Sequence, residues 1–292
     1  MILIGENLNV MSKTLGPAMK ARDAKPIQEM AVAETEAGVD YIDVNLGPAR
    51  KAGAEIMEWL VKTIQEVTDL PLFLDTTNVE AIEAGLKVHR GKAVINSIMA
   101  RPERMDALFP LAKKYDACAV ALLWGPQGMP RDSAERGALA VELMMKAAEY
   151  GVPSEDLWFD PIVTPVNTQQ DQVKSCTEFM MMFPDLAPES KATCGLSNVS
   201  NGAPEHLRPI LNQMYMTMLQ KYGMSGAIVD AFDANLKAIA RGEREQLVNL
   251  VWRVMDGEAV DMGSLSKEEA DYVKTVKILM GESLYSDSWL EL

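Results

Sequence analysis

Polar side chains follow most of the apolar segments that the sequence offers as strands. Residues 72–74 form an unbroken apolar run after Pro71, and Asp75 follows them; residues 93–95 lead to Asn96 in the same way. Such a run is typical of a strand buried on both faces, so each polar residue is expected where a strand meets the next loop. The other segments of this kind end on Asn9, Asn45, Asp160, Asn198 and Asp230.

Carboxylates and amides gathered at one end of a sheet have a definite chemistry. Asp accepts hydrogen bonds and Asn both donates and accepts, so the set suits a flat heterocycle with alternating N–H and C=O edges. A pterin fits, because one carboxylate can accept from its ring N–H and its exocyclic amine together. Capping of turns or helices is the other interpretation; it explains a single position such as Asn45 about equally well, but the whole set much less well.

A metal site is the rival interpretation of the same carboxylates. Asp43, Asp75 and Asp160 could bind Mg²⁺ together, as carboxylates do in enolase-type barrels. Those barrels pair the metal with a Lys or His base on another strand, and no predicted strand end here carries one. The three cysteines are isolated from each other and from histidine, which argues against a zinc site. We therefore predict no metal site.

Composition limits the partners and the compartment. The 292 residues include 28 basic and 42 acidic side chains, a formal charge of −14. Nucleic acids and anionic membranes attract positive surfaces, so neither is expected as a partner. The first apolar run is too short for a signal peptide, and no later segment is long enough to cross a bilayer. We expect a cytoplasmic protein.

The predicted elements alternate as strand and helix eight times, which favours a closed (β/α)8 TIM barrel, an α/β fold, over an open sheet. All strand ends then meet at one face. Residues 192–197 are expected to form the seventh strand, and the Thr77-x-x-Glu80 spacing predicts a helix-capping box. We expect residues 1–292 to form one domain in which residues 242–281 add an extra C-terminal helical pair, the second helix capped by Ser266 and Glu269.

Six segments in this order resemble the pterin-binding barrels. The resemblance is strongest to the methyltetrahydrofolate:corrinoid protein methyltransferases, namely the acetogenic corrinoid/iron–sulfur protein methyltransferases and their glycine-betaine-type relatives. These are related to the folate domain of cobalamin-dependent methionine synthase. The resemblance covers roughly residues 1–241. The segments are Gly5-Glu6-Asn7-Leu8-Asn9, Asp43-Val44-Asn45-Leu46-Gly47-Pro48, Leu74-Asp75-Thr76-Thr77-Asn78, Ile95-Asn96-Ser97, Asp160-Pro161 and Gly195-Leu196-Ser197-Asn198-Val199-Ser200.

The resemblance implies a role for each matching residue. Asp75, Asn96 and Asp160 would hold the pterin edge, and Asn198 would approach N5, the nitrogen that carries the methyl group, as the catalytic residue. Further pterin- or folate-binding residues implied by the resemblance are Ser197, Asn201 and Arg208.

The resemblance also implies the reaction and its partners. The substrate would be tetrahydrofolate or 5-methyltetrahydrofolate, and a separate corrinoid protein would carry the cobalamin. Because no side chain is placed as a covalent nucleophile, methyl should pass directly between N5 and cobalt. We also expect a homodimer, since an extra helical pair most often covers surface or makes a dimer contact.

Two alternatives stay open. Another pterin barrel such as dihydropteroate synthase is one, although its characteristic Ser-x-Lys near the seventh strand is replaced here by Ser197-Asn198. A non-catalytic module that binds folate or docks a corrinoid protein is the other. Methyl transfer in vitro distinguishes this module from an enzyme.

Overall fold

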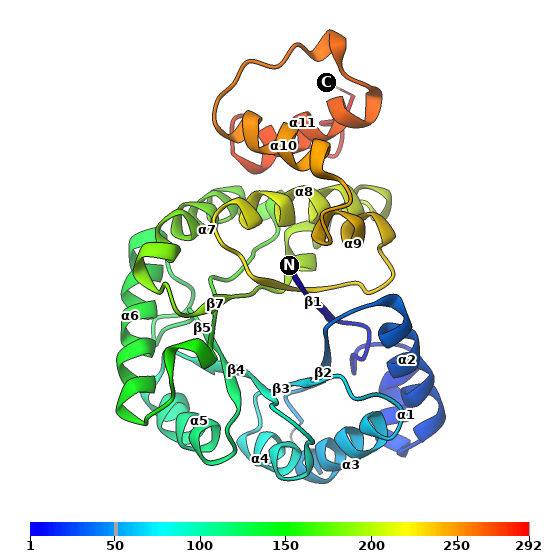
Figure 1. Ribbon diagram of the computed structural model, residues 1–292, viewed down its shortest axis with the longest axis vertical. Coiled ribbons are helices and arrows are strands. Elements are labelled where there is room, and N and C mark those ends of the chain that lie inside the picture. The colour runs from blue at the N-terminus through cyan, green and yellow to red at the C-terminus, as the bar shows by residue number, and fades with distance from the viewer. Residues whose placement is uncertain (50–51, 292) are drawn as a thin grey trace.

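The chain folds into an α/β barrel, as predicted. The computed structural model describes residues 1–49 and 52–291, and Figure 1 shows its strands as a ring surrounded by helices. All eight strands in the described residues run parallel, in the order β7-β6-β5-β4-β3-β2-β1-β8. They are β1 (Ile2–Gly5), β2 (Tyr41–Gly47), β3 (Leu72–Thr76), β4 (Val94–Met99), β5 (Cys118–Leu122), β6 (Leu157–Asp160), β7 (Lys191–Ala192) and β8 (Gly226–Val229).

Backbone hydrogen bonds close the ring between its first and last strands in the sheet order. Ser225 N–H donates to the Ala192 carbonyl at 3.0 Å, and Ile228 N–H donates to the Cys194 carbonyl at 2.8 Å. The outer layer consists of α1 (Leu15–Ala21), α2 (Ala24–Ala37), α3 (Gly53–Gln65), α4 (Val79–Val88), α5 (Pro102–Lys114), α6 (Ser133–Glu149), α7 (Val166–Leu186), α8 (Arg208–Lys221) and α9 (Ala234–Ala240).

The interior of the barrel is apolar below its polar end. Tyr41, Phe73 and Trp158 stack edge to face there, with ring centroids 5.4–5.5 Å apart. Side chains two positions apart on a strand face the same side. Asp75 therefore faces inward one layer above Phe73, and Asp160 one layer above Trp158. The same strands thus supply both the packed core and the polar mouth above it.

Two local predictions were wrong. The cap of α4 is Asn78, whose side chain accepts from Ala81 N–H at 3.1 Å, and not Thr77, because β3 continues through Thr76 and Asn is at least as strong a cap as Thr. The seventh strand is only two residues long, and Leu196–Ser200 forms the 3-10 helix η2. Serine and asparagine compete for local backbone bonds in this segment, as when Ser200 Oγ donates to the Ser197 carbonyl.

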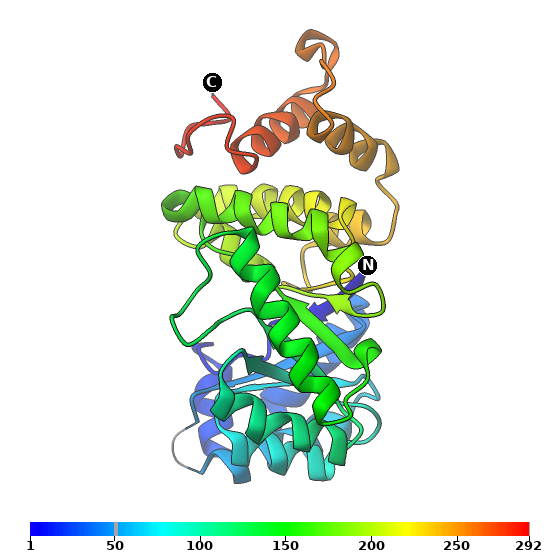
Figure 2. The same ribbon diagram turned by 90° about the vertical axis from the view of Figure 1, so that its left-hand side faces the viewer.

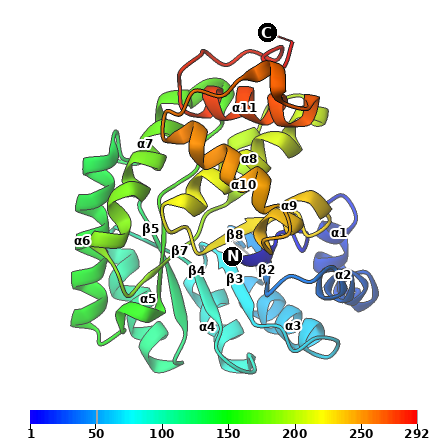
Figure 3. The same ribbon diagram turned by 45° about the horizontal axis from the view of Figure 1, so that its top comes forward.

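The extra helical pair is present as α10 (Glu245–Met255) and α11 (Lys267–Leu279), and we call residues 242–281 the C-terminal appendage. Both helices pack against α8, outside the ring of helices (Figures 2 and 3). The capping box of Ser266 and Glu269 is confirmed. None of the helices described is long and apolar enough to span a membrane.

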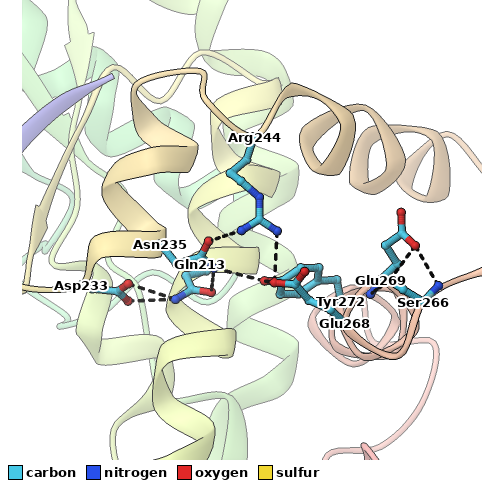
Figure 4. Close-up of polar contacts among 8 residues, drawn as sticks. All are labelled: Gln213, Asp233, Asn235, Arg244, Ser266, Glu268, Glu269 and Tyr272. Atoms are coloured by element: carbon cyan, nitrogen blue, oxygen red, sulfur yellow. Dashed lines mark hydrogen bonds and ion pairs between the residues drawn. The ribbon is translucent and has the colours of Figure 1, made fainter.

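A polar network joins the appendage to the barrel (Figure 4). Arg244 donates to Asn235 Oδ1 at 2.6 Å and to Glu268 Oε1 at 3.1 Å. Asn235, near the start of α9, in turn donates to Gln213 of α8 at 2.7 Å, and Gln213 donates to Asp233 at 3.0 Å. The network therefore runs from α11 to the residue that caps α9.

Candidate functional site

Three neighbouring strands bring amides and carboxylates together at the mouth of the barrel. The ladder register places Asn45 beside Asp75 and Asp75 beside Asn96. The Asn45 amide donates to the Asp75 carboxylate, and Asn96 Nδ2 donates to Asp43 Oδ1 at 3.0 Å. Asp43 and Asn96 are buried. Each carboxylate on these strands thus has an amide partner, which leaves its remaining lone pairs for a ligand.

The same carboxylates resist ionisation. Burial raises the pKa of Asp75 to about 7, while the hydrogen bond from Asn45 lowers it. Burial also raises the pKa of Asp43 well above its usual range, and the charge of Asp75 adds to this effect. Two adjacent carboxylates in a desolvated site disfavour a second negative charge. The site therefore favours ligands whose N–H groups stabilise a carboxylate.

Asp160 lies at the end of β6, and β5 separates it from Asn96. Its Oδ1 accepts from Ile162 N–H at 2.8 Å. Burial raises the pKa of this carboxyl to about 6, while that hydrogen bond and the charge of Arg136 lower it. Burial therefore raises the pKa of Asp160 less than that of Asp75, so Asp160 is the more readily ionised of these two carboxylates.

Asn198 is exposed at the rim, on η2. A Cβ atom built on Gly195 would lie 2.9 Å from Asn198 Nδ2, so the amide occupies space that only glycine leaves free. The Asn198 amide therefore packs against the backbone of Gly195, just after β7.

A cavity of about 480 Å³ opens beside η2, between the ends of β1 and β8 and the start of α8. Ser197 and Arg208 both line it, and Ser197 Oγ donates to Glu6 Oε2 at 2.9 Å. Arg208 Nε donates to Ser200 Oγ at 3.3 Å. Asn201 is exposed after η2 and is not among the described residues that line the cavity.

The sequence analysis missed Glu34, a fully buried residue of α2. Its Oε1 accepts from Asn7 N–H at 2.9 Å, and the Asn7 amide donates to Asp230 Oδ1 at 3.0 Å. A Cβ on Gly5 would come within 2.3 Å of Glu34 Oε1, so glycine admits the carboxyl to the strand end. Burial raises the pKa of Glu34 to about 7.

A signal for Glu34 existed in the sequence. The buried residues of α2 are Ile27, Ala31 and Glu34, at the four- and three-residue spacings of one helix face. A glutamate at a position on the apolar face of a helix therefore indicates a buried carboxyl group.

Comparisons with known proteins agree with this chemistry. A family model described as "Pterin binding enzyme" matches residues 5–230. The chain is 28% identical over 232 residues to the methylcorrinoid:tetrahydrofolate methyltransferase of Eubacterium limosum. The aligned region covers 79% of this chain and 85% of that protein. It is 28% identical over 263 residues to the methionine synthase of Mycobacterium leprae, covering 86% of this chain and 22% of that one.

Solved structures of similar shape include dihydropteroate synthases. The enzyme of Xanthomonas albilineans with 4-aminobenzoic acid matches with a TM-score of 0.62 at 18% identity, over 84% of this chain and 93% of that chain. The enzyme of Stenotrophomonas maltophilia with bound imidazole matches with a TM-score of 0.60 at 15% identity, over 84% and 92%. At these identities the likeness shows the barrel fold alone.

Proposed function

Because the chain belongs to the pterin-binding enzyme family, we propose that it moves a methyl group between N5 of tetrahydrofolate and the cobalt of a corrinoid that a separate protein carries. The likeness to a relative named as a methylcorrinoid:tetrahydrofolate methyltransferase, and to a methionine synthase, supports a methyltransferase class. The observation that carries the finer proposal is the alignment of Asn45, Asp75 and Asn96 across adjacent strands, with Asp160 across β5.

In this proposal the mouth binds the pterin by its polar edge. Asp75 and Asp160 accept from the ring N–H and the exocyclic amine, and Asn96 pairs with the carbonyl and the remaining nitrogen. N–H donors of the ligand favour the charged carboxylates, which offsets the cost of desolvating them. Ser197 and Arg208 line the neighbouring cavity, and in this proposal they contact the aminobenzoyl part of the folate.

Methyl transfer is then a direct displacement. In one direction N5 attacks the methyl on cobalt, the cobalt–carbon electron pair stays on cobalt as cob(I)alamin, and N5 loses its proton. In the other direction cob(I)alamin attacks the methyl of methyltetrahydrofolate, and N5 regains a proton. Asn198, an amide donor at the rim, stabilises charge that changes at N5 only during transfer.

The decisive experiment is to incubate the protein with tetrahydrofolate and methylcobalamin and follow the corrin absorbance. Conversion of methylcobalamin, with methyltetrahydrofolate formed in equal amount, supports the proposal. Folate binding without transfer, also with a corrinoid protein supplied, would instead identify a non-catalytic module. Condensation of a pterin pyrophosphate with 4-aminobenzoate would identify a dihydropteroate synthase.

The metal-barrel interpretation makes a different prediction. The side-chain amides of Asn45 and Asn96 already donate to the carboxylates of Asp75 and Asp43. A cation bound to the same oxygens would lie close to the positive N–H ends of these amides, which is unfavourable. We therefore expect transfer to persist in excess EDTA. Loss of activity that Mg²⁺ restores would favour the metal interpretation.

A further inference from the structure

Arg136 is a fully buried cation on α6, on the same face as Ala140 and Leu143. Its Nε donates to the Pro161 carbonyl at 2.8 Å. The two Nη atoms donate to side chains of α7, which lies beside α6 (Figure 1): Nη1 to Ser175 Oγ at 2.7 Å and Nη2 to Gln172 Oε1 at 2.9 Å.

All three acceptors of Arg136 are neutral, and Arg136 forms no ion pair with any carboxylate in residues 1–49 or 52–291. Burying a cation without a carboxylate partner costs stability, and an apolar side chain of similar volume often replaces such a group without loss. Packing alone therefore does not explain why α6 carries an arginine at this position.

The guanidinium lies directly behind the turn that follows β6. Pro161, whose carbonyl it binds, comes immediately after Asp160. The next residue, Ile162, has a φ of 66°, which is rare for a β-branched residue. This conformation aims the Ile162 N–H at Asp160 Oδ1, 2.8 Å away. By holding the Pro161 carbonyl, Arg136 fixes the turn that orients the carboxylate.

The charge of Arg136 reaches the same carboxylate. The titratable groups that face Asp160 are Arg136 from α6, Cys176 from α7 and Cys194, two residues after β7. Burial raises the pKa of both thiols, that of Cys176 to about 11, so they are neutral near pH 7. The positive charge opposes the rise in the pKa of Asp160 that burial causes.

We infer that Arg136 is a positioning residue for Asp160: its guanidinium holds the Asp160–Ile162 turn from behind and places a positive charge near the carboxylate, so that the carboxylate is oriented to accept two hydrogen bonds from one pterin edge. The choice of ligand rests on the proposed function. The coupling between the two side chains does not, because it exists in the ligand-free protein.

Three variants separate charge from packing. Arg136→Met removes the charge and the fork of donors, whereas Arg136→Lys keeps the charge. Gln172→Glu keeps the shape but places a carboxylate against the guanidinium, which screens its charge from Asp160. A purely structural arginine would tolerate Gln172→Glu, since the new ion pair would stabilise the contact.

The first measurement is the titration of Asp160 without ligand, by NMR of the protein labelled with ¹³C-aspartate and assigned with Asp160→Asn. We expect the midpoint to move to higher pH in Arg136→Met and in Gln172→Glu, and to stay near that of the wild type in Arg136→Lys. If Arg136→Met fails to fold, Gln172→Glu decides alone. An unchanged midpoint in the folded members of this pair would overturn the inference.

The second measurement is folate affinity as a function of pH. The ionised form of Asp160 binds, so affinity should fall as the pH drops through the Asp160 midpoint, and this loss should begin at higher pH in Arg136→Met. At pH 7 we expect affinity to fall about 10-fold. Asp75 titrates in the same range in every variant, so the comparison between variants isolates Asp160. A wild type with no folate affinity but the expected shifts in titration would overturn the proposed function and leave the Arg136–Asp160 coupling supported.

Discussion

The barrel mouth and the C-terminal appendage use the same residue types in opposite ways. At the mouth, burial raises the pKa of Asp75 and Glu34 to about 7. In the appendage, hydrogen bonds from Tyr272 and Arg244 lower the pKa of Glu268. The appendage places its charges in water beside partners of opposite sign, whereas the mouth keeps carboxylates where ionisation is costly.

The difference shows where function and stability conflict. A solvated glutamate that caps a helix or pairs with arginine stabilises the fold modestly. A desolvated carboxylate with only amide partners destabilises it near neutral pH, and such sites are common where ligands bind. Variants in the two regions should therefore differ in kind. Changes to the mouth residues assigned to the pterin affect binding and chemistry, neutralising a desolvated carboxylate such as Glu34 raises stability, and changes in the appendage lower stability.

The largest effect is expected for Asn198→Ala, measured by single-turnover transfer at saturating folate. Because the amide contributes where charge changes, the rate should fall by roughly 100-fold to 1,000-fold while folate affinity falls much less. Asn96→Ala is the control, since it should act mainly through binding. A near wild-type rate at saturation would mean that solvent or another group assists N5.

Asn96→Ala should weaken folate binding by roughly 5-fold to 150-fold, because it leaves a pterin edge and the buried Asp43 carboxyl unpaired. Titration with folate measures the effect, and circular dichroism checks the fold. The control is Asn235→Ala, which removes an asparagine from the polar network that joins the appendage to the barrel (Figure 4). It should leave folate affinity unchanged, because Asn235 is not assigned to the pterin. Equal affinities for both variants would contradict the assignment of the mouth.

Glu34→Gln should stabilise the protein by an amount that grows with pH. Burial raises the pKa of Glu34 from 4.5 to about 7, so between these values the folded state binds more protons than the unfolded state. Wild-type stability is therefore lost as the pH rises through this window, by roughly 1–3 kcal/mol. Thermal melts at pH 5 and pH 8 measure the difference.

The matched control for Glu34→Gln is Glu36→Gln, an exposed position on the same helix. It should show no such dependence on pH. A Glu34→Gln variant that is less stable than the wild type at pH 8 would mean that the ionised carboxylate is needed by Asn7.

Ser266→Ala should have the smallest effect. It removes the side-chain acceptor of a capping box at the start of α11, which costs about 1 kcal/mol of stability. Methyl transfer at a temperature where both proteins are folded should not change. Ser264→Ala is the control for urea denaturation, since Ser264 is an exposed residue at the end of a short 3-10 helix (Met262–Ser264), where its hydroxyl donates only to the nearby Asp261 carbonyl. A loss of transfer in Ser266→Ala would show that the appendage acts on the mouth.

The sequence by itself determined the barrel and the polar end of its strands. The apolar runs that stop at Asp75, Asn96 and Asp160 predict buried strands with a polar residue at the end. This prediction needs no knowledge of the partner strand, because alternation along one strand places each polar residue above a core position. The helical pair of the appendage and its cap at Ser266 could likewise be predicted from short segments of sequence, since a capping box is formed within four residues.

Only the tertiary structure decided which polar groups meet. The pairing of Asn45 with Asp75, and of Asn96 with Asp43, depends on the register between strands, which no single segment specifies. Glu34 and Arg136 are charged residues on the buried, otherwise apolar faces of their helices. Their spacing in the sequence shows that they are unusual, but it does not show which residues they contact. Their effects arise because packing removes water from them and brings distant segments together, and both desolvation and long-range contact are properties of the folded chain as a whole.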